Sequence, residues 1–214
     1  MNEVSDLVYV VLTPGDWHDV LDLLKNHFYT RENLRLGAGI DPAQPVTASE
    51  KKYIRTGLTT EVSVGAREKT TGRLVAVLIG IIITADDPHS YQAHENVTEE
   101  ERRLVRAMQM LPNVTDMFQE EGVESVLLIT RMCVHPDHGR RGVARRMTQI
   151  AIDIATKKGF QLAFSRTACL HTEKLFSSLG FQTHAVLDYR TRTDDLLDLS
   201  RMSHHQVAVM AKRL

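Results

Sequence analysis

The stretch that decides the fold is SVLLITRMCVHPDHGRRGVARRMTQIAIDIATKKG, residues 125–159. Its first ten residues are apolar and β-branched enough for a buried strand, and Pro136, which has no N–H donor, ends that strand. Apolar residues then recur at helical spacing until Gly159 stops the helix. A glycine turn between strand and helix leaves the first helical amides unpaired at the positive end of the helix dipole. The sequence therefore predicts an anion site at Gly142, of the kind that binds a diphosphate.

Positive charge gathers around the same turn. The chain has a formal net charge of -1 and a pI near 6.8, so no global field attracts it to nucleic acid or to anionic lipid. The local cluster consists of Arg140, Arg141, Arg145 and Arg146. Such a cluster suits the further phosphate groups of a nucleotide-like cofactor, although a solvated cationic surface is the alternative on composition alone.

The remaining chain alternates between strand and helix signals. We expect strands at residues 8–12, 62–67, 74–84, 125–134, 161–167, 181–189 and 203–212. We expect helices at residues 16–27, 47–57, 98–120, 142–158 and 171–179. Residues 31–45 and 85–96 have little periodicity and are predicted loops. These elements predict one α/β domain over residues 1–214.

Composition limits the cellular setting. The longest apolar run, residues 74–83, is shorter than the roughly 20 residues that a membrane helix needs. Acidic residues stand near the N-terminus where a signal peptide would be basic, so we expect a cytoplasmic protein. Its 2 cysteines offer no disulfide framework and no zinc motif, and we predict no metal. Two Asn-Val-Thr triplets are interpreted as chance matches to the glycosylation pattern.

Residues 135–160 (HPDHGRRGVARRMTQIAIDIATKKGF), followed by residues 167–181 (TACLHTEKLFSSLGF), resemble the GNAT superfamily of N-acetyltransferases. In that family, the turn before the helix has the pattern Gln or Arg, two variable residues, Gly, one variable residue, and then Gly or Ala. Gly142 and Ala144 fit the closing positions, whereas Gly139 stands where Gln or Arg is usual. Arg140 is a candidate to replace the missing side chain. The final Leu-Gly-Phe is also a hallmark of the family and ends the helix that flanks the pantetheine.

The resemblance implies an α/β (α+β) GNAT fold: a mixed, mostly antiparallel sheet of about seven strands, splayed between the fourth and fifth, with helices on both faces. It also implies acetyl-CoA as co-substrate. The residues expected to contact coenzyme A are Met132, Cys133, Val134, Gly139, Arg140, Arg141, Gly142, Val143, Ala144, Arg145 and Phe176. Backbone amides near Cys133 and Val134 are the expected oxyanion donors for the thioester carbonyl.

The stretch HFYTRENL, residues 27–34, resembles animal arylalkylamine N-acetyltransferases of the dopamine-acetylating type. That resemblance nominates Glu32 as the general base, acting through water, with Phe28 and Tyr29 as apolar walls of the amine pocket. A base is needed because an alkylammonium with a pKa of about 10 must lose a proton before it can attack a thioester. The alternative interpretation of Glu32 is an exposed loop carboxylate.

Many GNAT members have a tyrosine that protonates the leaving thiolate, but this chain has Phe176 at that position. Thr172 keeps a hydroxyl on the same helix and is the candidate acid; an ordinary first-turn threonine is the alternative. Cys133 with His135 or His171 as base is a weaker, nucleophilic alternative, so we expect direct transfer.

The expected acceptor is a small arylalkylamine such as dopamine, serotonin, octopamine or tyramine, with no nucleic-acid or membrane partner. Two alternatives remain open at this point. One is a GNAT enzyme that modifies a polyamine, an amino acid or a protein lysine. The other is a non-catalytic protein that binds acyl-CoA.

Overall fold

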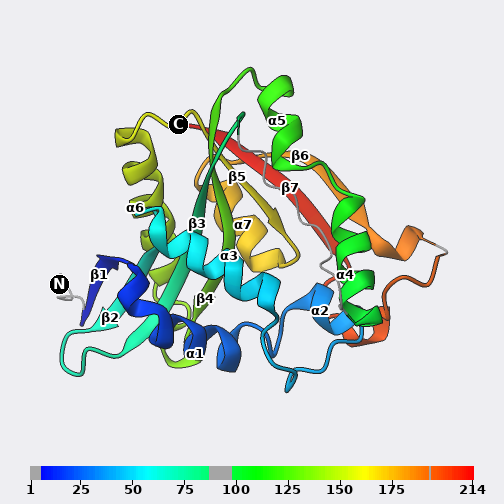
Figure 1. Ribbon diagram of the computed structural model, residues 1–214, viewed down its shortest axis with the longest axis horizontal. Coiled ribbons are helices and arrows are strands. Elements are labelled where there is room, and N and C mark those ends of the chain that lie inside the picture. Colours follow the sequence, from blue (N-terminus) through cyan, green and yellow to red (C-terminus); the bar gives the residue numbers. More distant parts are fainter. Residues whose placement is uncertain (1–5, 87–97, 193) are drawn as a thin grey trace.

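The computed structural model describes residues 6–86, 98–192 and 194–214, whose strands form one seven-stranded sheet (Figure 1). The strands are β1 (Leu7–Val11), β2 (Val64–Glu68), β3 (Leu74–Thr84), β4 (Ser125–Val134), β5 (Leu162–Thr167), β6 (Gln182–Asp188) and β7 (Gln206–Arg213). They lie in the order β1-β2-β3-β4-β5-β7-β6, and every neighbouring pair is antiparallel except β4 and β5. The predicted mixed, mostly antiparallel sheet is confirmed.

Helices cover both faces of the sheet. The α-helices are α1 (Trp17–His27), α2 (Asn33–Gly37), α3 (Ala48–Thr59), α4 (Glu99–Gln109), α5 (Val114–Glu120), α6 (Val143–Lys157) and α7 (Leu170–Ser178). Short 3-10 turns lie at Pro14–Asp16, Pro136–His138, Tyr189–Thr191 and Leu199–Arg201. Side chains of α1 to α5 pack on one face, and those of α6 and α7 pack on the other. None of the described helices is both long and apolar enough to cross a membrane.

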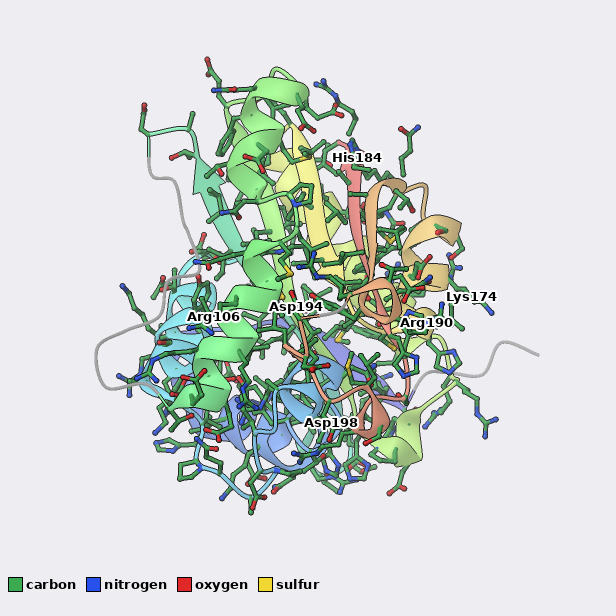
Figure 2. The ribbon with its side chains drawn as sticks, turned by 90° about the vertical axis from the view of Figure 1, so that its right-hand side faces the viewer. Arg106, Lys174, His184, Arg190, Asp194 and Asp198 are labelled. Carbon is green, nitrogen blue, oxygen red and sulfur yellow. The ribbon has the colours of Figure 1, made fainter. Side chains whose placement is uncertain are left out.

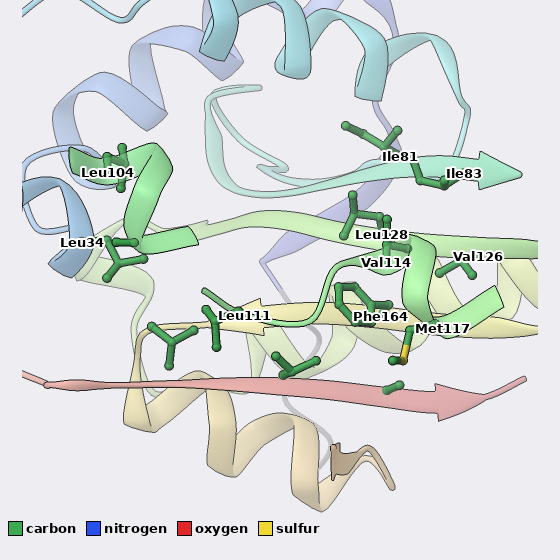
Figure 3. Close-up of a cluster of buried hydrophobic side chains, with 14 of the residues drawn as sticks. Leu34, Ile81, Ile83, Leu104, Leu111, Val114, Met117, Val126, Leu128 and Phe164 are labelled. Carbon is green, nitrogen blue, oxygen red and sulfur yellow. The ribbon is translucent and has the colours of Figure 1, made fainter. Parts of the chain in front are cut away.

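The two layers of core follow from strand alternation, because neighbouring side chains of a strand point to opposite faces. On β4, Val126 and Leu128 join the cluster under α4 and α5, together with Phe164 of β5 (Figure 3). Between them in sequence, Leu127 joins the opposite cluster with Met147 of α6. Both faces of β4 are thus buried, which explains its nearly continuous apolar sequence.

The sheet opens between β4 and β5. These parallel strands pair only from Val126↔Leu162 to Leu128↔Phe164. Beyond this point the Ser165 hydroxyl donates to the Ile129 carbonyl at 3.0 Å, while β4 continues along β3 and β5 continues along β7. The splay predicted between the fourth and fifth strands is therefore confirmed, and α6 begins close to its open end.

Two expectations were wrong at the level of elements. The loop predicted at residues 31–45 contains α2, because the Glu32 carboxylate caps its first amides. The single helix predicted at residues 98–120 is divided into α4 and α5, because Pro112 cannot donate a helical hydrogen bond and Asn113 starts a new capping box. Most of the loop predicted at residues 85–96 lies outside the described residues.

Candidate active site

Helix α6 begins without a side-chain cap. Gly142, the N-cap residue, has a φ of 77°, a conformation that glycine adopts readily. The first helical bond runs from Arg146 N–H to the Gly142 carbonyl at 3.0 Å. Within the described residues, no hydrogen bond uses the N–H groups of Val143, Ala144 or Arg145. Uncapped amides at the positive end of a 15-residue helix form a site for an anion.

The turn before α6 is held by an ionic chain that the sequence analysis missed. The buried His138 ring lies 3.1 Å from the Glu68 carboxylate of β2 through Nε2 and 3.1 Å from Arg141 through Nδ1. Arg141 also pairs with Asp6 at 2.5 Å. Hydrogen bonds, first from Arg73 and then from Thr71, lower the pKa of Glu68 to about 2, so its carboxylate stays ionised at neutral pH. These linked side chains fix the turn before α6 to the edge of the sheet formed by β1 and β2.

The arginines predicted to contact the cofactor therefore lie in different settings. Arg141 is engaged by Asp6 and His138. Arg145 donates to the Ser178 hydroxyl at 2.5 Å and joins α6 to α7. Arg140 is exposed, with a φ of 57°, on the solvent side of the turn next to Gly139. The Arg140 guanidinium has no hydrogen bond or ion pair with a described residue, so it can meet an anion at the turn without giving up a protein partner.

At the end of β4 that does not pair with β5, the N–H and C=O groups of every second residue point into the opening between the two strands. His135 N–H donates to the Val75 carbonyl of the β3 side at 2.8 Å. Because N–H and C=O groups of successive strand residues point to opposite sides, those of Val134 and Met132 point away from β3. Arg31 confirms this direction by donating to the Val134 carbonyl at 3.1 Å. Val134 N–H is thus a candidate oxyanion donor, whereas the expectation for the Cys133 amide is corrected, because that amide faces β3.

The Cys133 thiol is a poor nucleophile in this setting. The residue is buried beneath α1 and α3, and burial raises the pKa of its thiol in spite of Arg31, whose Nη2 lies 3.8 Å from Sγ. A raised pKa keeps a thiol protonated and unreactive at neutral pH. The geometry favours direct transfer over an acyl-enzyme on Cys133.

Glu32 is a partly buried helix cap. Its carboxylate accepts hydrogen bonds from Leu34 N–H at 3.2 Å and from Arg35 N–H at 2.7 Å. Burial raises the pKa of Glu32, and this effect outweighs the two backbone hydrogen bonds and the nearby Arg35 and Arg131. The alternative of an exposed loop carboxylate is wrong, while the role of general base stays a prediction that a raised pKa suits.

Aromatic rings gather around Arg131, on the side of the sheet that α1 and α3 cover. Tyr29 is buried, and its hydroxyl accepts a hydrogen bond from Arg131 Nε at 2.9 Å. The half-buried Phe28 contacts the Tyr29 ring edge to face, with centroids 5.3 Å apart. Tyr53 of α3, which the sequence analysis missed, lies 5.8 Å from the Arg131 guanidinium. The structure thus packs Phe28 against Tyr29 and places Tyr53 near Arg131, while the role of Phe28 and Tyr29 in an amine pocket stays a prediction.

Comparisons with known proteins agree with this geometry. The FR47-like protein family matches residues 105–190, which include β4, the glycine turn, α6 and α7. The polyamine N-acetyltransferase of Drosophila melanogaster, which forms N-acetylagmatine, superposes with a TM-score of 0.79 at 21% identity, over 98% of this chain and 100% of that one. Arylalkylamine N-acetyltransferase 2 of Aedes aegypti superposes with a TM-score of 0.75 at 16% identity, over 98% and 99% of the two chains.

The chain has the GNAT fold. The predicted resemblance to GNAT N-acetyltransferases is confirmed, and the structural neighbours named above are N-acetyltransferases. They include a NatC complex bound to a Gag peptide and CoA, with a TM-score of 0.57 at 12% identity, over 98% of this chain and 99% of the matched one. No curated protein matches the sequence.

In this GNAT fold, α7 packs on the same face of the sheet as α6, with Phe176 turned inward. Phe176 is 1% exposed and stacks on Phe181, with ring centroids 4.7 Å apart. Its placement shows a packing role, and its contact with coenzyme A stays a prediction. Thr172, in the first turn of α7, is partly exposed, and its hydroxyl has no hydrogen bond to a described residue. It remains the candidate acid.

The described residues contain no group of three His, Cys, Asp or Glu side chains arranged to hold a metal ion. The two cysteines are free thiols, with Cys133 buried and Cys169 exposed.

Proposed function

We propose that this chain is an acetyl-CoA-dependent N-acetyltransferase that transfers the acetyl group directly to the primary amine of a small molecule. One observation carries the proposal: the uncapped amides of α6 lie at the open end of the splayed sheet, and the free edge of β4 faces into that splay. The first feature fits a diphosphate and the second fits an extended amide-bearing chain. Coenzyme A contains both groups.

The chemistry assigned to the protein requires three groups. Val134 N–H donates to the oxygen that becomes negative as the amine attacks the thioester carbon. Glu32 accepts the proton that the ammonium must lose, directly or through water. A new C–N bond forms as the C–S bond breaks. The leaving thiolate, whose parent thiol has a pKa near 8.5, takes a proton from Thr172 or from water. The second proton, which the nitrogen loses as the amide forms, replaces the proton that the thiolate took.

The finer part of the proposal concerns the acceptor. Arylalkylamines are supported by two partly buried aromatic rings, those of Phe28 and Tyr53, which offer apolar surface around Tyr29 and Arg131. Arg131 is in turn one of the charges that act on the proposed base Glu32. The polyamine and arylalkylamine acetyltransferases among the structural neighbours favour a small amine in general. We further propose that residues 1–214 act as one domain in the cytoplasm.

Calorimetry with acetyl-CoA, combined with a thiol-release assay over a panel of amines, tests the proposal. We expect acetyl-CoA to bind and thiol to be released in step with an N-acetylated product. Binding without release from any amine would support the non-catalytic alternative. Absence of binding would refute the proposed function, because the α6 site would then have no diphosphate ligand.

A further inference from the structure

The segment that carries Glu32 crosses the open end of the splay. Arg31 donates through Nη2 to the Val134 carbonyl at 3.1 Å, at the end of β4. Two residues later, Asn33 donates through Nδ2 to the Ala168 carbonyl at 2.7 Å, directly after β5. Arg31, Glu32 and Asn33 therefore form a strap between the two strands that diverge beyond their short paired region.

Asn33 anchors the strap on the side of β5 and β7. It is 7% exposed, and both polar atoms of its side chain are hydrogen-bonded. Besides the bond that Nδ2 donates, Oδ1 accepts from the backbone N–H and from the hydroxyl of Ser203, each at 3.0 Å. Ser203 precedes β7, which pairs with β5. A buried amide whose hydrogen bonds are made holds one geometry, because each lost bond would leave a buried polar group unsatisfied.

Arg31 anchors the strap on the side of β3 and β4. Its Nη2 also lies 3.8 Å from Sγ of Cys133, so the guanidinium lies beside the last two residues of β4. The hydrogen bond uses the carbonyl of Val134, while the N–H of Val134 is the proposed oxyanion donor. The N–H and C=O groups of one strand residue point to the same side of the strand. The strap thus ends at the residue where the thioester carbonyl is expected.

The hydrogen bonds of the Glu32 carboxylate do not by themselves place it relative to the sheet. They come from the backbone of Leu34 and Arg35, so they move with α2. This helix has only five residues, too few to be stable without tertiary contacts. Its far end is held by Asp198 (Figure 2), whose N–H donates to the Gly37 carbonyl at 2.7 Å. Its near end, which carries the carboxylate, is held by the strap.

We propose that Arg31 and Asn33 are positioning residues, which hold the Glu32 carboxylate at the open end of the splay from β4 and from β5. The inference rests on the proposed acetyl transfer, in which Glu32 accepts the proton of the amine. A general base acts only within about 2.6–3.2 Å of the group that it deprotonates, or through one water. Since a displacement of about 1 Å can lower a rate about 10²-fold, loss of either anchor slows the reaction while the base is still present.

A double-mutant cycle tests whether the two residues act through the base. Single-turnover thiol release with saturating acetyl-CoA gives the rate of each variant. We expect Arg31→Ala and Asn33→Ala each to lower this rate about tenfold when Glu32 is present, and less than about twofold in the Glu32→Gln background. The acetyl-CoA dissociation constant should stay unchanged. Equal losses in the two backgrounds would overturn the inference, as would a Glu32→Gln variant with the wild-type rate.

A conservative variant separates the anchor on β4 from a contact with the cofactor. We expect Arg31→Lys to restore part of the rate that Arg31→Ala loses, because an ammonium can donate to the same Val134 carbonyl. If Arg31→Ala weakened acetyl-CoA binding and left the rate at saturation unchanged, Arg31 would be a cofactor contact and no positioning residue.

Arg106→Ala and Asn26→Ala are the matched controls. The Arg106 side chain is 59% exposed on the outer surface of α4 (Figure 2). Asn26 is exposed on α1, where its amide donates to Asp22 at 3.0 Å. We expect both controls to keep the wild-type rate. Thermal unfolding shows which variants are folded, and the exposed Arg31 decides the outcome if Asn33→Ala does not fold.

The inference and the proposed function fail in different ways. If acetyl-CoA binds and an amine releases thiol as fast in folded Arg31→Ala as in the wild-type protein, only this inference fails. If acetyl-CoA does not bind to the wild-type protein and no amine releases thiol, the proposed function fails as well.

Discussion

Glu32 has two roles in the geometry described above, that of a helix cap and that of a proposed base. Replacement by glutamine keeps one oxygen that can accept a hydrogen bond from α2 but removes the basic carboxylate. We expect Glu32→Gln to lower kcat about 10²- to 10⁴-fold, the usual contribution of a positioned base. The acetyl-CoA dissociation constant, measured by calorimetry, should stay unchanged. A variant with the wild-type rate at pH 7 would show that another group accepts the proton.

The raised pKa of Glu32 also predicts how stability depends on pH. A raised pKa means that the folded state binds the carboxyl proton more tightly than the unfolded state does. Glu32 therefore favours folding most at low pH, and this contribution is lost as pH rises from the unfolded value through the folded pKa. We expect the stability of Glu32→Gln relative to wild type to increase between pH 4 and pH 7, measured by urea unfolding. A decrease would mean that the two capping hydrogen bonds lower the pKa of Glu32 by more than burial raises it.

At the scale of elements, a matched pair of glycine substitutions distinguishes a ligand-binding role of the α6 start from the general cost of alanine at a positive φ. Gly142 and Gly122 have φ values of 77° and 59°, and a Cβ added at either meets no atom within 4 Å. Alanine at each position should therefore cost about 1–2 kcal/mol from backbone strain alone. We expect Gly142→Ala to weaken acetyl-CoA binding in calorimetry and Gly122→Ala to leave it unchanged. If Gly142→Ala bound acetyl-CoA as tightly as the wild-type protein does, the α6 amides would not be the diphosphate site.

Elements with strong local signals were predictable from the sequence, whereas contacts between distant segments were not. The turn at Gly142 and helix α6 follow from glycine, proline and helical periodicity within one stretch. The helix α2 was missed because its start depends on a single capping carboxylate and it is only five residues long. Arg131 and Tyr29, which are 102 residues apart in sequence, meet only through the packing of α1 on β4. No local pattern contains that information.

The same limit applied to the charges of the candidate site. The sequence pattern nominated Glu32 through a family resemblance and pointed to the arginines beside Gly142. His138 carried no signal, because it looked like a loop histidine. Its partner, the Glu68 carboxylate of β2, comes from an element that is 70 residues away in sequence.

At the scale of the whole molecule, two parts of the sheet are joined by only three register pairs between β4 and β5. A ligand that lies along the free edge of β4 and reaches α6 should stabilise this junction. We expect acetyl-CoA at about 100 times its dissociation constant to add about 2.7 kcal/mol to the free energy of unfolding. Hydrogen exchange should slow at Met132 and Val134 and at the first amides of α6. Free pantetheine, which lacks the diphosphate, should give little protection at the same concentration. Equal protection by pantetheine would show that the β4 edge, and not the α6 amides, supplies the affinity, and the diphosphate site would then have to be abandoned.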